Sequence, residues 1–178
     1  MYLGSETMQN TPAAQHCFGE FLLTYALYRE KKLNYADQEI VYNRWNKPSL
    51  RDYPNIHYNI SHCKGLTACV LSDVPVGIDV EKIRPFSISA AKRVCEKLEM
   101  EDIQRSKDKD RHFFIYWTLK ESCVKAIGYG ITYPMKKVVF RLTDNEIRCI
   151  TQPEYHFKLI EDSSSFVIAV CYKRYENY

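Results

Sequence analysis

Apolar and polar residues alternate along this chain in two patterns, one with the period of a helix and one with the period of a strand. Gly128 and Gly130 mark the end of the longest helical pattern, because glycine commonly follows a helix C-terminus. The predicted helices cover residues 12–32, 87–98, 100–106 and 110–127. The predicted strands cover residues 56–60, 65–71, 74–81, 137–142, 146–150, 156–160 and 166–172.

The order of these elements, a helix followed by strands, occurs twice and predicts an α+β fold. Each repeat would form a small sheet with a long helix, and the two similar halves would pack against each other. The boundary is expected near Val76, with an N-terminal half at 1–76 and a C-terminal half at 77–178. A site between the halves would then lie at their junction.

Composition limits the class of protein. The 178 residues are 46% hydrophobic, and 25 basic against 22 acidic side chains give a formal charge of +3. This balance lacks the basic excess of nucleic-acid-binding domains but suits an anionic ligand. No apolar run approaches the ~20 residues that span a bilayer, and seven cysteines without a C-x-x-C pair indicate free thiols. We therefore expect a cytoplasmic protein that binds neither membranes nor nucleic acid.

Two carboxylates lie on one predicted strand, residues 74–81. Side chains alternate between the faces of a strand, so Asp79 and Glu81 share one face while Ile78 and Val80 share the other. Neighbouring like charges repel, and a cation between them would offset the repulsion. Mg2+ prefers oxygen ligands of this kind. The alternative is an acidic pair on a solvated sheet face.

The predicted helix at 110–127 adds a third carboxylate and two lysines. Glu121 and Lys125 are one turn apart on its polar side, which is also the spacing of an ordinary surface ion pair. Lys120 points into the apolar side, where an unpaired charge is costly. An anion held at the junction of the two halves would offset that cost.

Two further elements carry phosphate-binding residue types. Ser61 and His62 follow a predicted strand where it enters a turn, and both side chains can donate hydrogen bonds to a phosphate. Lys47 precedes Pro48 in an irregular segment. A structural histidine and an ordinary turn are the alternatives at these positions.

Three segments together resemble the 4'-phosphopantetheinyl transferase superfamily. They are 57–62, 77–81 and 117–125, and they resemble the family patterns F-N-I-S-H, G-I-D-[VI]-E and W-[ST]-x-K-E-[AS]-x-x-K. The three occur in order, and the resemblance extends over about residues 12–172. The chain is similar to the two-half, surfactin-synthetase-activating type, whose halves form a pseudo-dimer within a monomer.

The resemblance implies a reaction. The phosphopantetheine arm of coenzyme A moves to a serine of an apo acyl or peptidyl carrier protein, and adenosine 3',5'-bisphosphate is released. The carrier would belong to fatty-acid, polyketide or nonribosomal-peptide synthesis.

The resemblance also implies roles for individual residues. The metal ligands for Mg2+ would be Asp79, Glu81 and Glu121. The catalytic residues would be Asp79, Glu121 and Lys125, with Glu121 or a metal-bound water accepting the serine proton. The coenzyme would be bound by Lys47, Ser61, His62, Lys120 and Lys125, and the 3'-phosphate in particular by Ser61, His62 and Lys47.

The chain also departs from the family. Relatives of this type carry basic residues before the first helix that reach the coenzyme, and His16 is a candidate replacement here. Residues 84–93 mix basic and apolar side chains that suit the acidic helix of a carrier protein. Two other functions stay open from the sequence, a non-catalytic module that binds coenzyme A or the carrier and a metal-dependent phosphoesterase.

Overall fold

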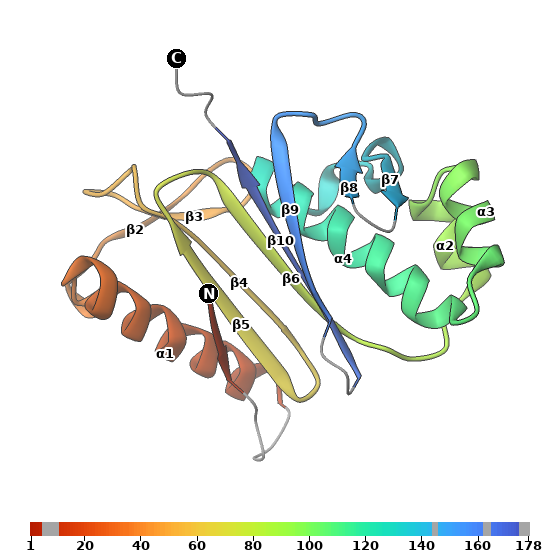
Figure 1. Cartoon of the computed structure of the whole chain (residues 1–178). Helices are drawn as coiled ribbons and strands as arrows, with labels where there is room; N and C mark the ends of the chain where they lie inside the picture. The colour runs from red at the N-terminus through yellow and green to blue at the C-terminus, as the bar shows by residue number, and fades with distance from the viewer. Residues whose placement is uncertain (5–10, 144–145, 162–164, 175–178) are drawn as a thin grey trace.

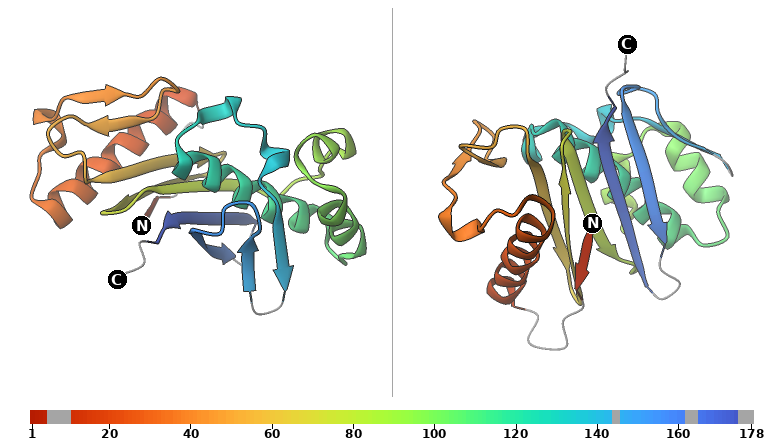
Figure 2. Two further views of the ribbon diagram at one scale, coloured as in Figure 1. Left: turned by 90° about the horizontal axis from the view of Figure 1, so that it is seen from above. Right: turned by 60° about the vertical axis from the view of Figure 1, so that its left-hand side comes forward.

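A row of long strands runs through the middle of the molecule, and two long helices lie on the same side of it (Figures 1 and 2). The computed structural model describes residues 1–4, 11–143, 146–161 and 165–174. The α-helices are α1 (Pro12–Lys31), α2 (Ile88–Val94), α3 (Lys97–Arg105) and α4 (Lys109–Ile127). Short 3-10 helices span Tyr35–Asp37, Gly130–Thr132 and Met135–Lys137.

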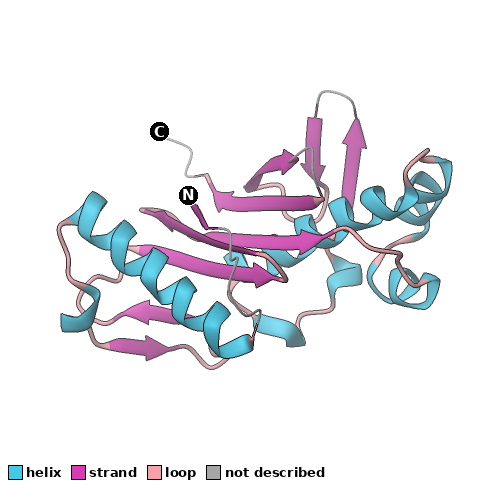
Figure 3. Cartoon of the chain, turned by 90° about the horizontal axis from the view of Figure 1, so that it is seen from below, coloured by secondary structure: helices cyan, strands magenta, loops and turns pink. Residues whose placement is uncertain are grey.

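The strands form two antiparallel three-stranded sheets and two hairpins. One sheet has the order β1-β5-β4 and the other β6-β10-β9, while β2 pairs with β3 and β7 with β8. Figure 3 shows the short β2–β3 hairpin beside α1. This arrangement confirms the predicted α+β class. The strands are β1 (Tyr2–Gly4), β2 (Ile40–Tyr42), β3 (Pro48–Leu50), β4 (His57–Cys63), β5 (Leu66–Ser72), β6 (Val76–Lys82), β7 (Phe140–Thr143), β8 (Glu146–Cys149), β9 (Tyr155–Glu161) and β10 (Phe166–Lys173).

Both long helices begin and end as their sequences predict. The Thr11 hydroxyl accepts a hydrogen bond from the backbone N–H of Ala14 at 3.2 Å, which caps α1. The Asp108 carboxylate caps α4 in the same way, and Gly128 ends that helix with a left-handed φ of 84°. The helix α4 is buried on most sides. It packs against β6 and β10 on one side and contacts α3 on another.

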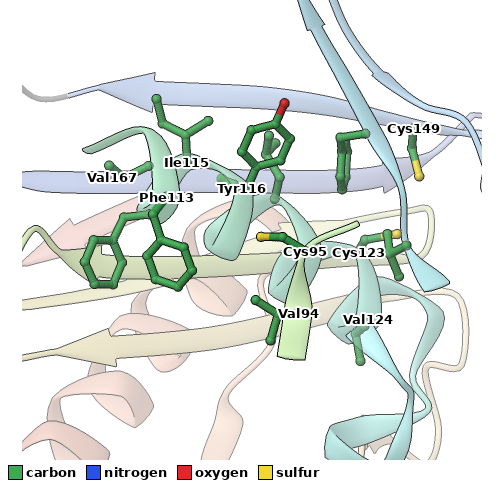
Figure 4. Close-up of a cluster of buried hydrophobic side chains, with 14 of the residues drawn as sticks. Val94, Cys95, Phe113, Ile115, Tyr116, Cys123, Val124, Cys149 and Val167 are labelled. Carbon is green, nitrogen blue, oxygen red and sulfur yellow. The ribbon is translucent and has the colours of Figure 1, made fainter. Parts of the chain in front are cut away.

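The larger core lies around α4. Figure 4 shows Phe113, Tyr116 and Cys123 of this helix pointing among side chains from other elements, including Cys149 of β8 and Val167 of β10. A second core fills the space between α1 and the β1-β5-β4 sheet. Within the described part of the chain, no helix is both long enough and apolar enough to span a membrane.

Some predicted boundaries were wrong for local reasons. The predicted helix at 87–98 is split at Cys95 and Glu96, because both residues are extended and Glu96 caps α3, with its backbone N–H donating to the Glu99 carboxylate at 2.7 Å. The strand β4 continues through His62 to Cys63, because the turn comes only at Gly65, which has a φ of 94°. The strands β1, β2 and β3 were not predicted, since three residues each are too few for a periodic pattern.

Candidate active site

The two sheets meet where β4 and β6 run side by side in the same direction. The side-chain oxygen of Asn59 accepts a hydrogen bond from the backbone N–H of Ile78 at 2.8 Å. The Ser61 hydroxyl accepts one from the backbone N–H of Val80 at 3.3 Å. Side chains of β4 therefore take the place of backbone partners along this edge of β6. The predicted domain boundary at 76 falls at the first residue of β6, and the division itself stays a prediction.

Gly77 brings α4 into direct contact with β6. A Cβ atom at this position would lie 2.1 Å from the carbonyl oxygen of Ser122 and 2.4 Å from the backbone nitrogen of Ala126. No real Cβ tolerates such distances, so only glycine allows the helix to lie this close to the strand. The close approach places the side chains of α4 beside Asp79, which shares a strand face with Gly77.

Asp79 is at the centre of a buried polar network. Its Oδ1 atom accepts hydrogen bonds from Lys125 Nζ at 2.6 Å and from the Ser61 hydroxyl at 2.9 Å. Lys125 Nζ also lies 3.0 Å from the Ser61 hydroxyl. The second oxygen, Oδ2, is buried and has no hydrogen-bond partner among the described residues. A buried carboxylate oxygen without a partner is costly, and a bound cation would relieve that cost.

Two further carboxylates, those of Glu81 and Glu121, are close enough to Asp79 for electrostatic repulsion to affect them. Burial raises the pKa of Glu121 above its ordinary value, nearby Lys125 opposes this rise, and repulsion from Asp79 and Glu81 adds to it. Burial also raises the pKa of Glu81, whose carboxylate pairs with Arg84 at 2.7 Å. Both side chains would gain from a cation that favours their charged forms.

The three carboxylates of Asp79, Glu81 and Glu121 are therefore suitable ligands for a hard divalent ion. In this structure, however, they do not converge on one point. Among the residues that the structure describes, no group of three histidine, cysteine or acidic side chains is close enough to hold a metal. In this arrangement the Oδ1 atom of Asp79 forms an ion pair with Lys125. Binding of an ion would require rotation of these side chains.

A pocket of about 220 Å³ opens beside this network. It lies between the turn that joins β2 to β3 and the C-terminal half of α4, and both Glu121 and Lys125 reach it. The described residues that line it are Trp45, Asn46, Lys47, Pro48, Asn59, Glu121, Val124, Lys125, Gly128 and Gly130.

Comparison with known proteins shows the family to which the chain belongs. Residues 75–171 match the family model of the 4'-phosphopantetheinyl transferase superfamily. The chain is 32% identical over 160 residues to the 4'-phosphopantetheinyl transferase Sfp of Bacillus subtilis, an overlap of 86% of this chain and 71% of that protein. This chain belongs to the 4'-phosphopantetheinyl transferase superfamily. The enzyme class predicted from the three sequence segments is thus confirmed.

A cyanobacterial relative and a solved structure match a smaller share of this chain. A 4'-phosphopantetheinyl transferase of Nostoc, HetI, is 35% identical over 113 residues, which is 59% of this chain and 47% of that protein. A holo-(acyl-carrier-protein) synthase of Bacillus anthracis, solved with CoA (3',5'-ADP), is 21% identical with a TM-score of 0.49. That likeness covers 55% of this chain and 93% of that one.

Lys120, within the third motif of this transferase, is not placed as the sequence predicted. Its side chain is fully buried, and its Nζ lies 2.8 Å from the carboxylate of Glu99, which is also fully buried. It also donates a hydrogen bond to the carbonyl oxygen of Val138. The prediction that Lys120 needs a bound anion at the junction was wrong, because Glu99 of α3 supplies the anion.

Removing one partner of this buried pair should destabilise the transferase strongly. Lys120→Met would leave Glu99 charged and buried, and we expect a loss of about 3–5 kcal/mol in the free energy of unfolding. The double variant Glu99→Gln, Lys120→Met should recover part of that loss, because no uncompensated charge remains and glutamine keeps an acceptor near the backbone N–H groups of Glu96 and Phe140. Urea denaturation measures both values. Equal destabilisation by the single and double variants would contradict a simple ion pair.

The other predicted coenzyme ligands are spread out. Ser61 is buried in the middle of the Asp79 network rather than in a turn. His62 is exposed on β4, and His16 is exposed on α1, 3.6 Å from Glu20. Neither histidine is among the described residues that line the pocket. Lys47 does line the pocket, but its ammonium group points at backbone carbonyls of α4.

Among the pocket residues missed from the sequence are Asn59, Trp45 and Gly130. Asn59 lies inside the first motif, but its polar side chain in an apolar strand was given no role. Trp45 and Gly130 both line the pocket and lie in direct contact, since the carbonyl oxygen of Trp45 would lie 3.0 Å from a Cβ at Gly130. The Trp45 ring also contacts Tyr129 with 4.4 Å between ring centroids. The Gly128 and Gly130 pair was the available signal, since it indicates close backbone approach.

Proposed function

We propose that this protein transfers the 4'-phosphopantetheine group of coenzyme A to a serine of an apo acyl or peptidyl carrier protein and releases adenosine 3',5'-bisphosphate. One observation carries the proposal. Asp79 has a buried oxygen without a described partner, and it pairs with Lys125, which lines the pocket together with Glu121. This combination suits a divalent ion and a phosphate together.

The proposed metal is Mg2+, held by Asp79, Glu81 and Glu121. When bound, it would neutralise charge on the pyrophosphate and orient it for in-line attack. Asp79 would offer the ion its second oxygen, which has no partner among the described residues. Glu81 would exchange its ion pair with Arg84 for the metal ion.

Lys125 could contact a phosphate oxygen with its remaining N–H donor. Its side chain lines the pocket, and its ammonium group donates at once to two acceptors, Asp79 at 2.6 Å and the Ser61 hydroxyl at 3.0 Å. A positive charge placed there favours the transition state, in which charge on the transferred phosphoryl group is redistributed. Glu121 or a water molecule would accept the proton of the attacking serine.

The same proposal extends to the rest of the coenzyme and to the partner. Ser61 and His62 on β4 would lie nearest the 3'-phosphate, with His16 as a further basic contact. Residues 84–93 would meet an acidic helix of the carrier protein. The halves at 1–76 and 77–178 would form a pseudo-dimer, so that a monomer contains the whole site.

The test is a transfer assay with a fluorescent coenzyme A analogue and purified apo carrier proteins. We expect labelling of carrier serine with Mg2+, loss of labelling with EDTA, and recovery when Mg2+ is restored in excess. Glu101→Gln, at an exposed carboxylate of α3, is the matched control and should label normally.

Other outcomes would identify other functions. Binding of coenzyme A without transfer to any carrier would indicate a non-catalytic module. Hydrolysis of a simple phosphodiester without a carrier protein would indicate a phosphoesterase. Either result would overturn the proposed transfer reaction.

A further inference from the structure

The C-terminal end of α4 is covered by a turn from the other half of the chain. The last carbonyl groups of a helix have no partners within the helix. Here Lys47 Nζ donates to the carbonyl oxygens of Lys125 at 2.7 Å and Ala126 at 3.0 Å. Asn43 Nδ2 donates to the carbonyl oxygen of Gly128 at 3.0 Å. The 43–47 turn, which joins β2 to β3, therefore closes the end of the helix that carries Glu121 and Lys125.

The ammonium group of Lys47 has a third acceptor, the carbonyl oxygen of Val76 on β6 at 3.3 Å. A lysine has three N–H donors, and these three carbonyls account for all of them. All three acceptors are neutral, and burial lowers the pKa of Lys47 to about 8. Lys47 thus joins the end of α4 to the start of β6.

The turn is built to hold Lys47 in this position. The side-chain oxygen of Asn43 accepts hydrogen bonds from the backbone N–H groups of Trp45 and Lys47, both at 2.9 Å. Asn46 has a left-handed φ of 64°, which asparagine tolerates better than most residues. A Cβ at Gly128 would lie 3.0 Å from Lys47 Cδ, so glycine there leaves room for the lysine stem.

We propose that the 43–47 turn is a positioning cap for α4, and that Lys47 acts through Lys125 rather than by contacting the 3'-phosphate of coenzyme A. The inference rests on the proposed transfer reaction and revises the role that the sequence suggested for Lys47. Loss of the cap would loosen the last turn of α4 and misplace the Lys125 ammonium group. A misplacement of about 1 Å can lower a rate by about a hundredfold.

The test compares two substrates that differ in one group. Lys47→Met and Asn43→Ala are assayed with coenzyme A and with 3'-dephospho-coenzyme A, and Lys158→Met on β9 is the exposed-lysine control. A cap predicts that both variants lower kcat by about tenfold to a hundredfold with either substrate. The ratio of kcat/KM between the two substrates should stay at the wild-type value in both variants. The control should match the wild type.

If Lys47 instead binds the 3'-phosphate of coenzyme A, the opposite pattern is expected. Lys47→Met would then keep kcat, raise KM for coenzyme A, and lose the preference for coenzyme A over its dephospho form. That result, or a normal kcat for Asn43→Ala, would overturn the cap.

Amide hydrogen exchange tests the same inference without any activity. The cap predicts faster exchange at residues 121–128 in Lys47→Met and Asn43→Ala than in Lys158→Met, and unchanged exchange there would overturn it. If the wild type transfers to no carrier, the proposed function fails, while the exchange result still decides the cap.

Discussion

Replacing Gly77 by alanine is expected to destabilise the protein by about 3 kcal/mol or more, at the upper end of overpacking effects. The added methyl group would meet the backbone of Ser122 and Ala126 at 2.1 and 2.4 Å, and backbone atoms inside a helix cannot move aside singly. The whole of α4 would have to shift away from β6. Urea denaturation measures the loss, and a transfer assay at low temperature should show lost activity in whatever protein stays folded.

Gly19→Ala is the matched control for this prediction. A Cβ there would lie 2.8 Å from Ile60 Cγ2, a single side-chain atom rather than the backbone of a helix. Alanine is also favoured over glycine inside a helix by about 0.5–1 kcal/mol, which offsets part of the cost. We expect Gly19→Ala to be much less destabilising than Gly77→Ala. Similar losses for the two variants would show that the contact between α4 and β6 is not as close as described.

Glu121→Gln should abolish transfer and yet stabilise the metal-free protein. Glutamine keeps the shape but removes one ligand charge, and we expect kcat to fall by about a hundredfold to a thousandfold. In EDTA the same change removes a buried charge that repels Asp79 and Glu81, so the melting temperature should rise by about 2–4 °C per kcal/mol gained. Thermal melts with and without Mg2+ measure this, with Glu101→Gln as control. A lower melting temperature in EDTA would contradict the repulsion.

The pH dependence of this effect has a definite sign. Folding raises the pKa of Glu121 above its ordinary value of 4.5, so the folded metal-free protein binds a proton more tightly than the unfolded chain does. The contribution of Glu121 to stability is therefore most favourable below that ordinary value and is lost as the pH rises through the folded pKa. Glu121→Gln should flatten the fall in stability over this range. A stability profile parallel to that of the wild type would argue against the raised pKa.

The faces of β6 could be predicted because they depend on strand periodicity alone. Asp79 and Glu81 share a face of β6, while Ile78 and Val80 pack in a core on the other face. The spacing of Glu121 and Lys125, one helical turn apart on α4, likewise follows from helix geometry. The long helices were predicted well because capping residues and glycine mark their ends.

The partners of the lysines could not be predicted, because they come from distant elements. Glu99 reaches Lys120 from a separate helix, and its buried position depends on how α3 packs on α4. Lys47 reaches the carbonyl oxygens of residues that lie 78 and 79 positions further along the chain. A sequence pattern indicates that a buried lysine needs acceptors, but the tertiary packing decides which acceptors it finds.

The most direct test of the proposed centre is the binding of Mn2+ as a spectroscopic substitute for Mg2+, followed by electron paramagnetic resonance. We predict one bound ion per chain in the presence of coenzyme A, with affinity at least about tenfold weaker in Glu121→Gln, as expected for loss of one charged ligand. Equal Mn2+ binding by the wild type and Glu121→Gln, or no binding that depends on coenzyme A, would contradict a metal site formed by β6 and α4.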